Sequence, residues 1–166
     1  MPVLTRLRSP RTTDAEEYSV MLICSSGGHL AQLLRLREWW KDRRRTWVSF
    51  DKEDVRSSLE GETVVMGHHP TTRNIPNLLR NLVLAVRVLL RDRPDVIVSN
   101  GAGLAVPFFW FGWLLGIPCV WLEVYDRIDS PTMTGRLVRP VSSLFCVQWE
   151  EQIKVYPGAT VVGPVW

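Results

Sequence analysis

The chain has 166 residues, 46% of them apolar, and a formal net charge of +3. This length and apolar fraction suffice for one domain with its own core, and no internal repeat or low-complexity segment is visible. The basic residues are scattered without a recognisable module, which argues against nucleic acid as a partner. They are densest at 41–45, and such patches favour phosphates or acidic lipids. Eight tryptophans favour an interface, with a membrane surface among the candidates.

Segment 1–17 is polar, basic and proline-containing and lacks the apolar run of a signal peptide, so we expect a flexible basic arm. An apolar run at 20–24 follows and stops at the Ser-Ser-Gly-Gly segment 25–28, after which a helical pattern begins at His29. This order predicts a strand, a tight glycine turn and a helix N-terminus, where free N–H groups attract an anion. In the alternative, purely structural interpretation the glycines only turn the chain and His29 only caps the helix.

Two further strands are predicted at 46–50 and 62–66, on either side of a short charged helix at 51–59. The adjacent His68 and His69 come next, and neighbouring histidines can ligate a metal ion. No third ligand is evident nearby, so a plain loop or a substrate contact is favoured over a metal site.

The longest predicted helix runs from residue 75 to about residue 92, with a proline in its first turn. Its apolar positions form a broad stripe that comprises Leu78, Leu79, Leu82, Val83, Val86, Leu89 and Leu90. Three arginines line another side of this helix. Either the stripe covers a sheet and the arginines are solvated, or the helix lies beside anionic lipid headgroups.

No charged residue occurs from 96 to 122, a length typical of a membrane span. Glycines and prolines interrupt this stretch, so we divide it into a buried strand at 95–99, a glycine turn at 100–103, an apolar helix at 104–115 and a second strand at 119–123. A helix that is apolar all round is buried, or it faces lipid or another chain. The residues expected to face the membrane are Arg80, Arg87, Arg91, Phe108, Phe109, Trp110 and Trp113.

The remaining predicted elements are a helical piece at 132–138, a strand at 143–147, a short helix at 150–155 and a last strand at 160–162. Alternating strands and helices predict an α/β fold with a doubly wound, parallel, Rossmann-like sheet. In such sheets ligands bind outside the carboxyl ends of the strands. Segments 25–29, 100–103 and 123–127 all fall at that edge, and their convergence is a stronger signal than any one of them.

Three stretches, SSGGHL, DVIVSNGAGLAVPF and WLEV, together resemble the acceptor-side subunit of split glycosyltransferases. This family includes the membrane subunit of the eukaryotic UDP-N-acetylglucosamine transferase that makes a dolichol-linked disaccharide, and bacterial exopolysaccharide proteins of the PssD type. The resemblance covers about residues 18–166. It implies a Rossmann-like, acceptor-binding domain that is the N-terminal half of a GT-B glycosyltransferase.

The same resemblance implies a partner subunit of the PssE type that holds a UDP-sugar, and an acceptor that is a polyprenyl-diphosphate-linked sugar. It places the protein at the cytoplasmic face of the cell membrane, in bacterial polysaccharide biosynthesis. GT-B transferases usually need no bound metal, so we expect neither a metal nor a cofactor.

Glycosyl transfer needs a base for the acceptor hydroxyl, and the resemblance makes His29 the candidate. Glu123 competes, because a carboxylate at a buried strand end can also take a proton, and we expect Glu123→Gln to lower transfer and to leave stability nearly unchanged. The residues expected to receive the acceptor's phosphates or sugar are Ser26, Gly27, Gly28, Asn100, Gly101 and Gly103.

Two other functions stay open at this point. The chain could be a non-catalytic membrane scaffold that recruits a glycosyltransferase. A nucleotide-binding Rossmann protein is a weaker alternative, because the GxGxxG spacing is missing after the first strand.

Overall fold

The computed structural model describes residues 18–165, so the arm predicted at 1–17 lies outside the described residues, as does Trp166. The strands are β1 (Ser19–Ile23), β2 (Arg44–Phe50), β3 (Val64–Gly67), β4 (Val96–Ser99), β5 (Cys119–Leu122), β6 (Leu144–Val147) and β7 (Thr160–Val161). The helices are α1 (Gly28–Arg35), α2 (Arg37–Trp40), α3 (Glu53–Ser58), α4 (Ile75–Asp92), α5 (Ala105–Leu114) and α6 (Met133–Val138), with short 3₁₀ turns η1 (Arg139–Val141) and η2 (Glu150–Lys154). The strands pair in parallel in one seven-stranded sheet of order β3-β2-β1-β4-β5-β6-β7, which confirms the predicted doubly wound α/β fold.

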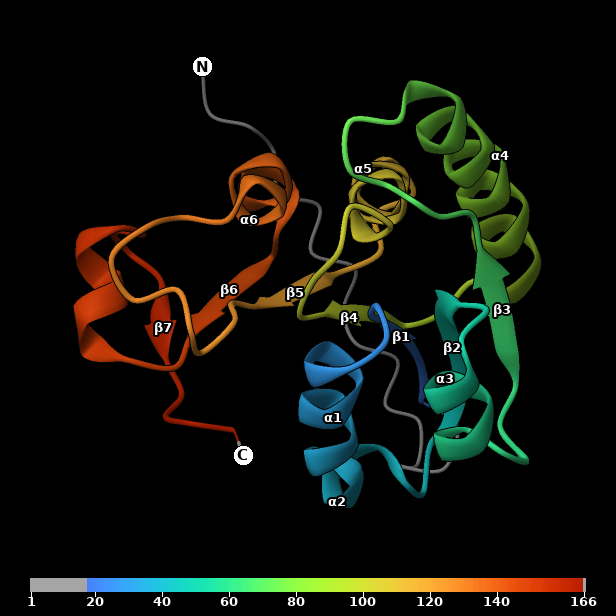
Figure 1. Ribbon diagram of the computed structural model, residues 1–166, viewed down its shortest axis with the longest axis horizontal. Coiled ribbons are helices and arrows are strands. Elements are labelled where there is room, and N and C mark those ends of the chain that lie inside the picture. Colours follow the sequence, from blue (N-terminus) through green and yellow to red (C-terminus); the bar gives the residue numbers. More distant parts are fainter. Residues whose placement is uncertain (1–17, 166) are drawn as a thin grey trace.

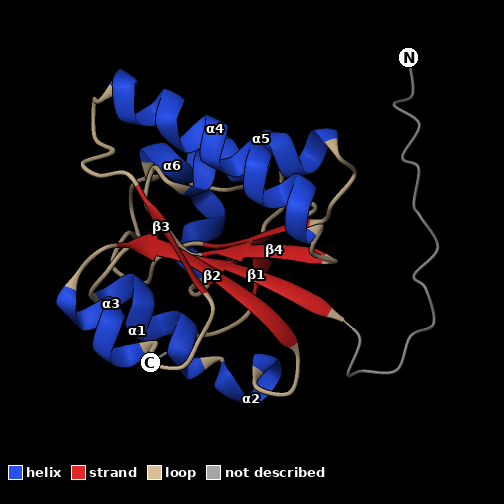
Figure 2. Ribbon diagram, turned by 90° about the vertical axis from the view of Figure 1, so that its right-hand side faces the viewer, coloured by secondary structure: helices blue, strands red, loops and turns tan. Residues whose placement is uncertain are grey.

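Two cores lie on opposite faces of this sheet, because successive side chains of a strand point to opposite sides. In β1, Met21 and Ile23 pack with residues of α4, α5 and α6, whereas Val20 and Leu22 pack with residues of α1, α2 and α3. Figures 1 and 2 show these two helical layers on either side of the sheet. Burial on both faces explains why the strands are continuous apolar runs in the sequence.

The winding direction reverses between β1 and β4, which pair with each other. From β1 the sheet continues outward through β2 to β3, and from β4 it continues the other way through β5 and β6 to β7. At such a reversal the loops leave the sheet toward opposite faces and open a crevice outside the strand ends. The segments that follow β1 and β4 therefore border the crevice where a ligand is expected.

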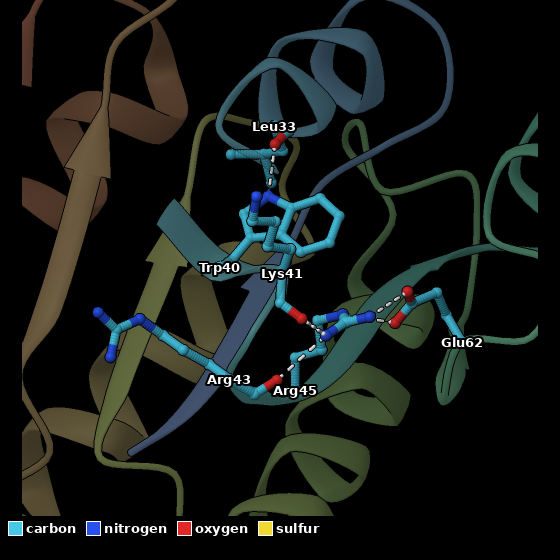
Figure 3. A network of polar contacts seen from close by, with 6 residues as sticks. All are labelled: Leu33, Trp40, Lys41, Arg43, Arg45 and Glu62. Atoms are coloured by element: carbon cyan, nitrogen blue, oxygen red, sulfur yellow. Dashed lines mark hydrogen bonds and ion pairs between the residues drawn. The ribbon is translucent and has the colours of Figure 1, made fainter. Parts of the chain in front are cut away.

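The basic cluster at 41–45 serves mainly to join segments of the protein to one another, although its composition favours phosphate binding. Arg45 donates two hydrogen bonds to the carboxylate of Glu62, at 2.7 and 2.6 Å, and two more to the carbonyl oxygens of Lys41 and Arg43. Its guanidinium lies over the ring of Trp40, 4.9 Å from the centroid. Figure 3 shows this network, in which Arg45 at the start of β2 is joined to Glu62 in the segment before β3.

The charge-free stretch divides into β4, α5 and β5 as predicted, and no helix among residues 18–165 is long and apolar enough to cross a membrane. α5 lies close on the sheet, because a Cβ added to Gly112 would come within 2.5 Å of the Ile97 side chain. Phe108 and Phe109 are fully buried on that side, so the expectation that they face a membrane is wrong. Trp110 and Trp113, on the outer side of the same helix, are 41% and 51% exposed.

The buried side of α4 is polar in its first half, at Asn77 and Asn81, and apolar in its second half, at Ala85, Val88 and Leu89. Most of the leucine stripe therefore does not cover the sheet, as it would in one of the two alternatives drawn from the sequence. Asn81 makes two hydrogen bonds with the main chain of His68, at 2.8 and 2.9 Å, and the Asn77 amide donates to the carbonyl of Pro70 at 2.9 Å. These bonds fix the loop after β3 to the helix. Five members of the stripe are consequently 41–59% exposed: Leu78, Leu79, Leu82, Val83 and Leu90.

Candidate functional site

His29 lies in the first turn of α1, at the reversal point between β1 and β4. Its Nδ1 is 3.1 Å from the carbonyl oxygen of Asn100, which follows β4. A carbonyl oxygen only accepts, so Nδ1 carries the proton and the neutral ring keeps Nε2 as its basic nitrogen. Asn100 in turn donates from its side-chain amide to the His29 carbonyl at 2.7 Å, so the two segments are joined by reciprocal bonds.

The pKa of His29 is lowered from its ordinary value of 6.5, chiefly because burial disfavours the charged ring. The hydrogen bond to Asn100 and the negative charges of Asp126 and Glu123 oppose this shift. A lowered pKa keeps the ring neutral near pH 7, which is the form that a general base requires.

The glycine turn after β4 packs closely against its neighbours, and Gly101 lies against the ring of His29. A Cβ at Gly101 would overlap the imidazole, and a Cβ at Gly103 would come within 3.1 Å of Thr71. Gly27, at φ 72°, precedes α1 in a left-handed conformation that favours glycine. The structure therefore brings together the predicted residues of both turns, with Ser26 and Gly28 in the turn that carries His29.

The main-chain N–H groups of these turns are partly occupied within the chain. The Asp54 carboxylate of α3 accepts from the N–H of Gly27 at 2.7 Å, and the Ser99 hydroxyl accepts from the N–H of Gly101 at 3.3 Å. A carboxylate at the glycine turn repels a phosphate and attracts hydroxyl donors. This arrangement does not support the expectation that Gly27 and Gly101 offer their N–H groups to phosphate.

Glu123 follows β5 and is fully buried. Its carboxylate accepts hydrogen bonds from the main chain of Val124 at 3.0 Å, from the hydroxyl groups of Thr132 and Tyr156, and from the indole of Trp121 at 3.4 Å. Burial first, and then the bond to Glu123 and its charge, raise the pKa of Tyr156 to about 12, so the phenol keeps the proton that it donates. Both oxygens are thus engaged inside the protein, which gives Glu123 a structural role in place of the expected role as a competing base.

The Glu123 cluster closes only because Gly135 of α6 has no side chain, since a Cβ there would overlap the carboxylate of Glu123. Two glutamines hold the loop that follows. Gln148 donates to the carbonyl of Glu123 at 2.9 Å, and Gln152 donates to the carbonyls of Val124 and Arg127 at 2.9 and 3.1 Å. This loop carries Asp126, whose charge acts on His29.

Several of these residues have no signal in the sequence that could have singled them out. Asp54 is one acid among several in a charged helix, and Thr132 and Tyr156 are distant in sequence from Glu123. The helix-capping role of Thr132, whose hydroxyl accepts from the N–H of Gly135, was the one local clue, because threonine is a favoured N-cap residue.

The adjacent histidines do not form part of a metal centre in the described part of the chain. Within residues 18–165 no group of three or more His, Cys, Asp or Glu side chains is placed to hold a metal ion. His68 is held through its main chain by Asn81, and the ring of His69 packs edge-on against Phe50, 5.6 Å between centroids.

A doubly wound parallel sheet with a partly buried histidine at its reversal point defines the fold as a Rossmann-like half-domain. The MurG protein of Acinetobacter baumannii has this fold, with a TM-score of 0.73 and 17% identity over 90% of this chain and 46% of that one. A UDP-GlcNAc 2-epimerase of Methanocaldococcus jannaschii matches with a TM-score of 0.62 over 82% of this chain and 41% of that one. The chain thus spans less than half the length of these solved structures.

Residues 67–165 match the family described as "Oligosaccharide biosynthesis protein Alg14 like". The chain is 24% identical to the UDP-N-acetylglucosamine transferase subunit ALG14 of Homo sapiens, over 96% of this chain and 88% of that protein. It is 30% identical to the ALG14 subunit of Kluyveromyces lactis over 69% of this chain and 49% of that protein. The chain belongs to the Alg14-like family, which confirms the resemblance seen in its motifs.

We expect Glu123→Gln to lower the free energy of unfolding by about 2 kcal/mol, because the new amide cannot accept from all the donors that surround the carboxylate. This prediction differs from the one made from the sequence, which was that stability stays nearly unchanged. Urea denaturation followed by circular dichroism measures the effect. Glu150→Gln, at an exposed position on η2, is the matched control and should change stability by less than about 0.5 kcal/mol. Equal stability of the two variants would contradict the structural role.

The second expectation concerns the titration of His29, followed by NMR of its ring protons. The midpoint should lie below pH 6.5, and Asp126→Asn should lower it further, because the lost carboxylate stabilises the charged ring. The His29 signal is assigned by its loss in His29→Ala. A midpoint that rises in Asp126→Asn would contradict the placement of Asp126 beside the ring.

Proposed function

We propose that this chain is the acceptor-binding subunit of a two-chain glycosyltransferase. Membership of the Alg14-like family makes the chain a glycosyltransferase subunit, of the type found in UDP-N-acetylglucosamine transferase. The finer proposal is that the donor is a UDP-sugar held by a PssE-like partner, and that the acceptor is a polyprenyl-diphosphate-linked saccharide of bacterial polysaccharide biosynthesis. The observation that carries it is a partly buried histidine at the reversal point of half a GT-B fold, whose Nδ1 lies 3.1 Å from the Asn100 carbonyl oxygen and so leaves Nε2 as the basic nitrogen.

The proposed chemistry is one displacement at the anomeric carbon of the donor sugar. Nε2 of His29 takes the proton of the acceptor hydroxyl as its oxygen bonds to the anomeric carbon, and the bond from that carbon to the diphosphate oxygen breaks. UDP leaves with the electron pair, and the imidazolium that forms is stabilised by Asp126 and by the carbonyl of Asn100. In this proposal the partner supplies the donor pocket, which the word "subunit" in the name of the ALG14 relatives supports.

An apolar surface supports the proposed membrane contact. The outer sides of α4, α5 and α6, which lie next to one another in Figures 1 and 2, carry most of the large exposed apolar residues of the described chain. We call this the α4–α6 apolar face, and it comprises Ile75, Leu78, Leu79, Leu82, Val83, Leu90, Trp110, Trp113, Leu114, Leu115, Met133 and Leu137. Many exposed apolar residues on neighbouring helices are typical of a membrane or protein contact. The arginines Arg80, Arg87 and Arg91 lie exposed on α4, although Arg91 is paired with Asp92.

Transfer by the reconstituted pair tests the catalytic proposal. His29→Ala should lower kcat by about 10²-fold or more, because the base is lost. Gly101→Ala should lower kcat by about tenfold to a hundredfold, because the new Cβ displaces the imidazole. The φ angle of Gly101 is not positive, so alanine itself causes no backbone strain at this position. Product is measured with a UDP-sugar and a polyprenyl-diphosphate-linked acceptor, and thermal melts verify folding.

Unchanged transfer by the His29→Ala pair would contradict the catalytic role and favour a scaffold that recruits a complete enzyme. Turnover by this chain without any partner would contradict the two-chain proposal instead.

Flotation with anionic vesicles tests the membrane contact. Trp113→Gln on the α4–α6 apolar face should lower the bound fraction several-fold, since an indole at the interface contributes about 1–2 kcal/mol. Trp39→Gln, at a 41% exposed tryptophan of the opposite layer, is the matched control and should not change binding. Binding should also fall with added salt. Equal losses in both variants would contradict contact through this face.

A further inference from the structure

The charges around His29 are of the wrong sign for the acceptor's diphosphate. Asp54 already occupies the N–H of Gly27, and the charges of Asp126 and Glu123 act on His29 itself. The charges of these carboxylates would repel a diphosphate placed at this turn. A sugar suits the same surroundings, because its hydroxyl groups donate hydrogen bonds to carboxylates.

A groove of about 370 Å³ on the flank of α4 has the opposite character. Its walls are formed by His68, Leu79, Arg80, Val83, Leu84 and Arg87, with no acidic residue among them. The ion pairs of the described residues involve neither of its arginines. Arg80 is instead positioned by a hydrogen bond from its Nη1 to the side-chain oxygen of Asn77 at 3.2 Å. The groove therefore combines uncompensated positive charge with an apolar floor.

The two arginines are seven residues apart, which places them on one side of the helix about 10 Å apart along its axis. Both side chains are long and flexible enough to converge on one anion that lies between them. Guanidinium groups donate in a planar fork that matches phosphate oxygens. A diphosphate, with oxygens on two phosphorus atoms, fits two such donors better than a single phosphate does.

The groove is connected to His29 by a continuous series of packed segments. The ring of His29 lies against Gly101, Gly103 lies against Thr71, and the loop that contains Thr71 begins at His68 on the rim of the groove. Asn81 holds the main chain of His68, so this rim is fixed to α4. Leu79 and Val83 line the same groove and also belong to the α4–α6 apolar face.

We propose that this groove binds the diphosphate of an isoprenoid-diphosphate acceptor between Arg80 and Arg87. The acceptor sugar then points past Thr71 toward His29, and the first isoprenoid units lie on Leu79 and Val83 on their way to the bilayer. This assignment rests on the proposed function, and it moves the phosphate site away from the glycine turns to α4. Asp54 becomes a residue that accepts hydroxyl groups of the acceptor sugar.

Calorimetric titration of the full chain with farnesyl diphosphate, a short soluble isoprenoid diphosphate, tests the groove without any transfer reaction. We expect saturable binding of one molecule, and a loss of at least about tenfold in affinity in Arg80→Gln/Arg87→Gln, since each charge-assisted bond contributes that much. The double variant Arg35→Gln/Arg37→Gln removes the same charge from exposed positions on the opposite layer and should bind like the parent chain. Farnesol should bind much more weakly than farnesyl diphosphate.

Three results would overturn the proposal. Farnesyl diphosphate that fails to bind the parent chain, or that binds equally well to the groove variant, removes the site. A groove variant that loses flotation with phosphatidylglycerol vesicles but keeps its affinity for farnesyl diphosphate assigns the arginines to bulk phospholipid. Circular dichroism melts of each variant verify that lost binding does not reflect unfolding.

Transfer by the reconstituted pair separates the groove from the proposed function. If the groove assignment and the proposed function are both correct, Arg80→Gln/Arg87→Gln raises KM for the polyprenyl-diphosphate acceptor about tenfold or more and leaves KM for the UDP-sugar unchanged. Normal acceptor KM in this variant, with His29→Ala inactive, overturns the groove and keeps the function. Saturable farnesyl diphosphate binding by a pair that transfers no sugar keeps the groove and overturns the function.

Discussion

β1 is paired in parallel along both of its edges, with β2 on one side and β4 on the other, and it is buried on both faces. Because the sheet winds outward in opposite directions from this pair, the segments that follow β1 and β4 meet outside the strand ends. That meeting is sealed by reciprocal bonds between His29 and Asn100, one through the imidazole and one through the side-chain amide. The orientation and tautomer of the ring are therefore consequences of the strand order.

Polar interactions of different kinds hold the surroundings of this ring. On one side the buried carboxylate of Glu123 gathers Thr132 and Tyr156 from segments that are distant in sequence, and it sets the course of the loop that carries Asp126. On the other side the amides of Asn77 and Asn81 bind the loop after β3 to α4. Negative charge thus gathers at the histidine, whereas unpaired positive charge lies along α4. An acceptor that carries a sugar at one end of a diphosphate matches this separation.

The sequence predicted the parallel sheet, the two glycine turns and their convergence at one edge of the sheet, because continuous apolar runs that stop at glycine or serine are local signals. It could not predict which side of α4 faces the sheet, because that depends on hydrogen bonds from Asn77 and Asn81 to a loop whose position is set by the fold. For α5, apolar on every side, periodicity carries no information about orientation, and Gly112 decides it by allowing contact with the sheet. The structural role of Glu123 was likewise hidden, because its donors come from segments far along the chain.

α4 is held on the sheet by the buried Ala85, Val88 and Leu89 together with the amides of Asn77 and Asn81. The helix can therefore fold onto its sheet in water before its outer leucines are covered. The domain then reaches its native topology while a large apolar area remains hydrated, and the free energy of covering that area is still available to a later event. Folding and attachment are thus separate steps, and the second draws on hydrophobic surface that the first leaves unused. Until attachment occurs, self-association through the same apolar surface competes with it. The solubility of the free chain therefore depends on its concentration relative to that of the surface to which it attaches.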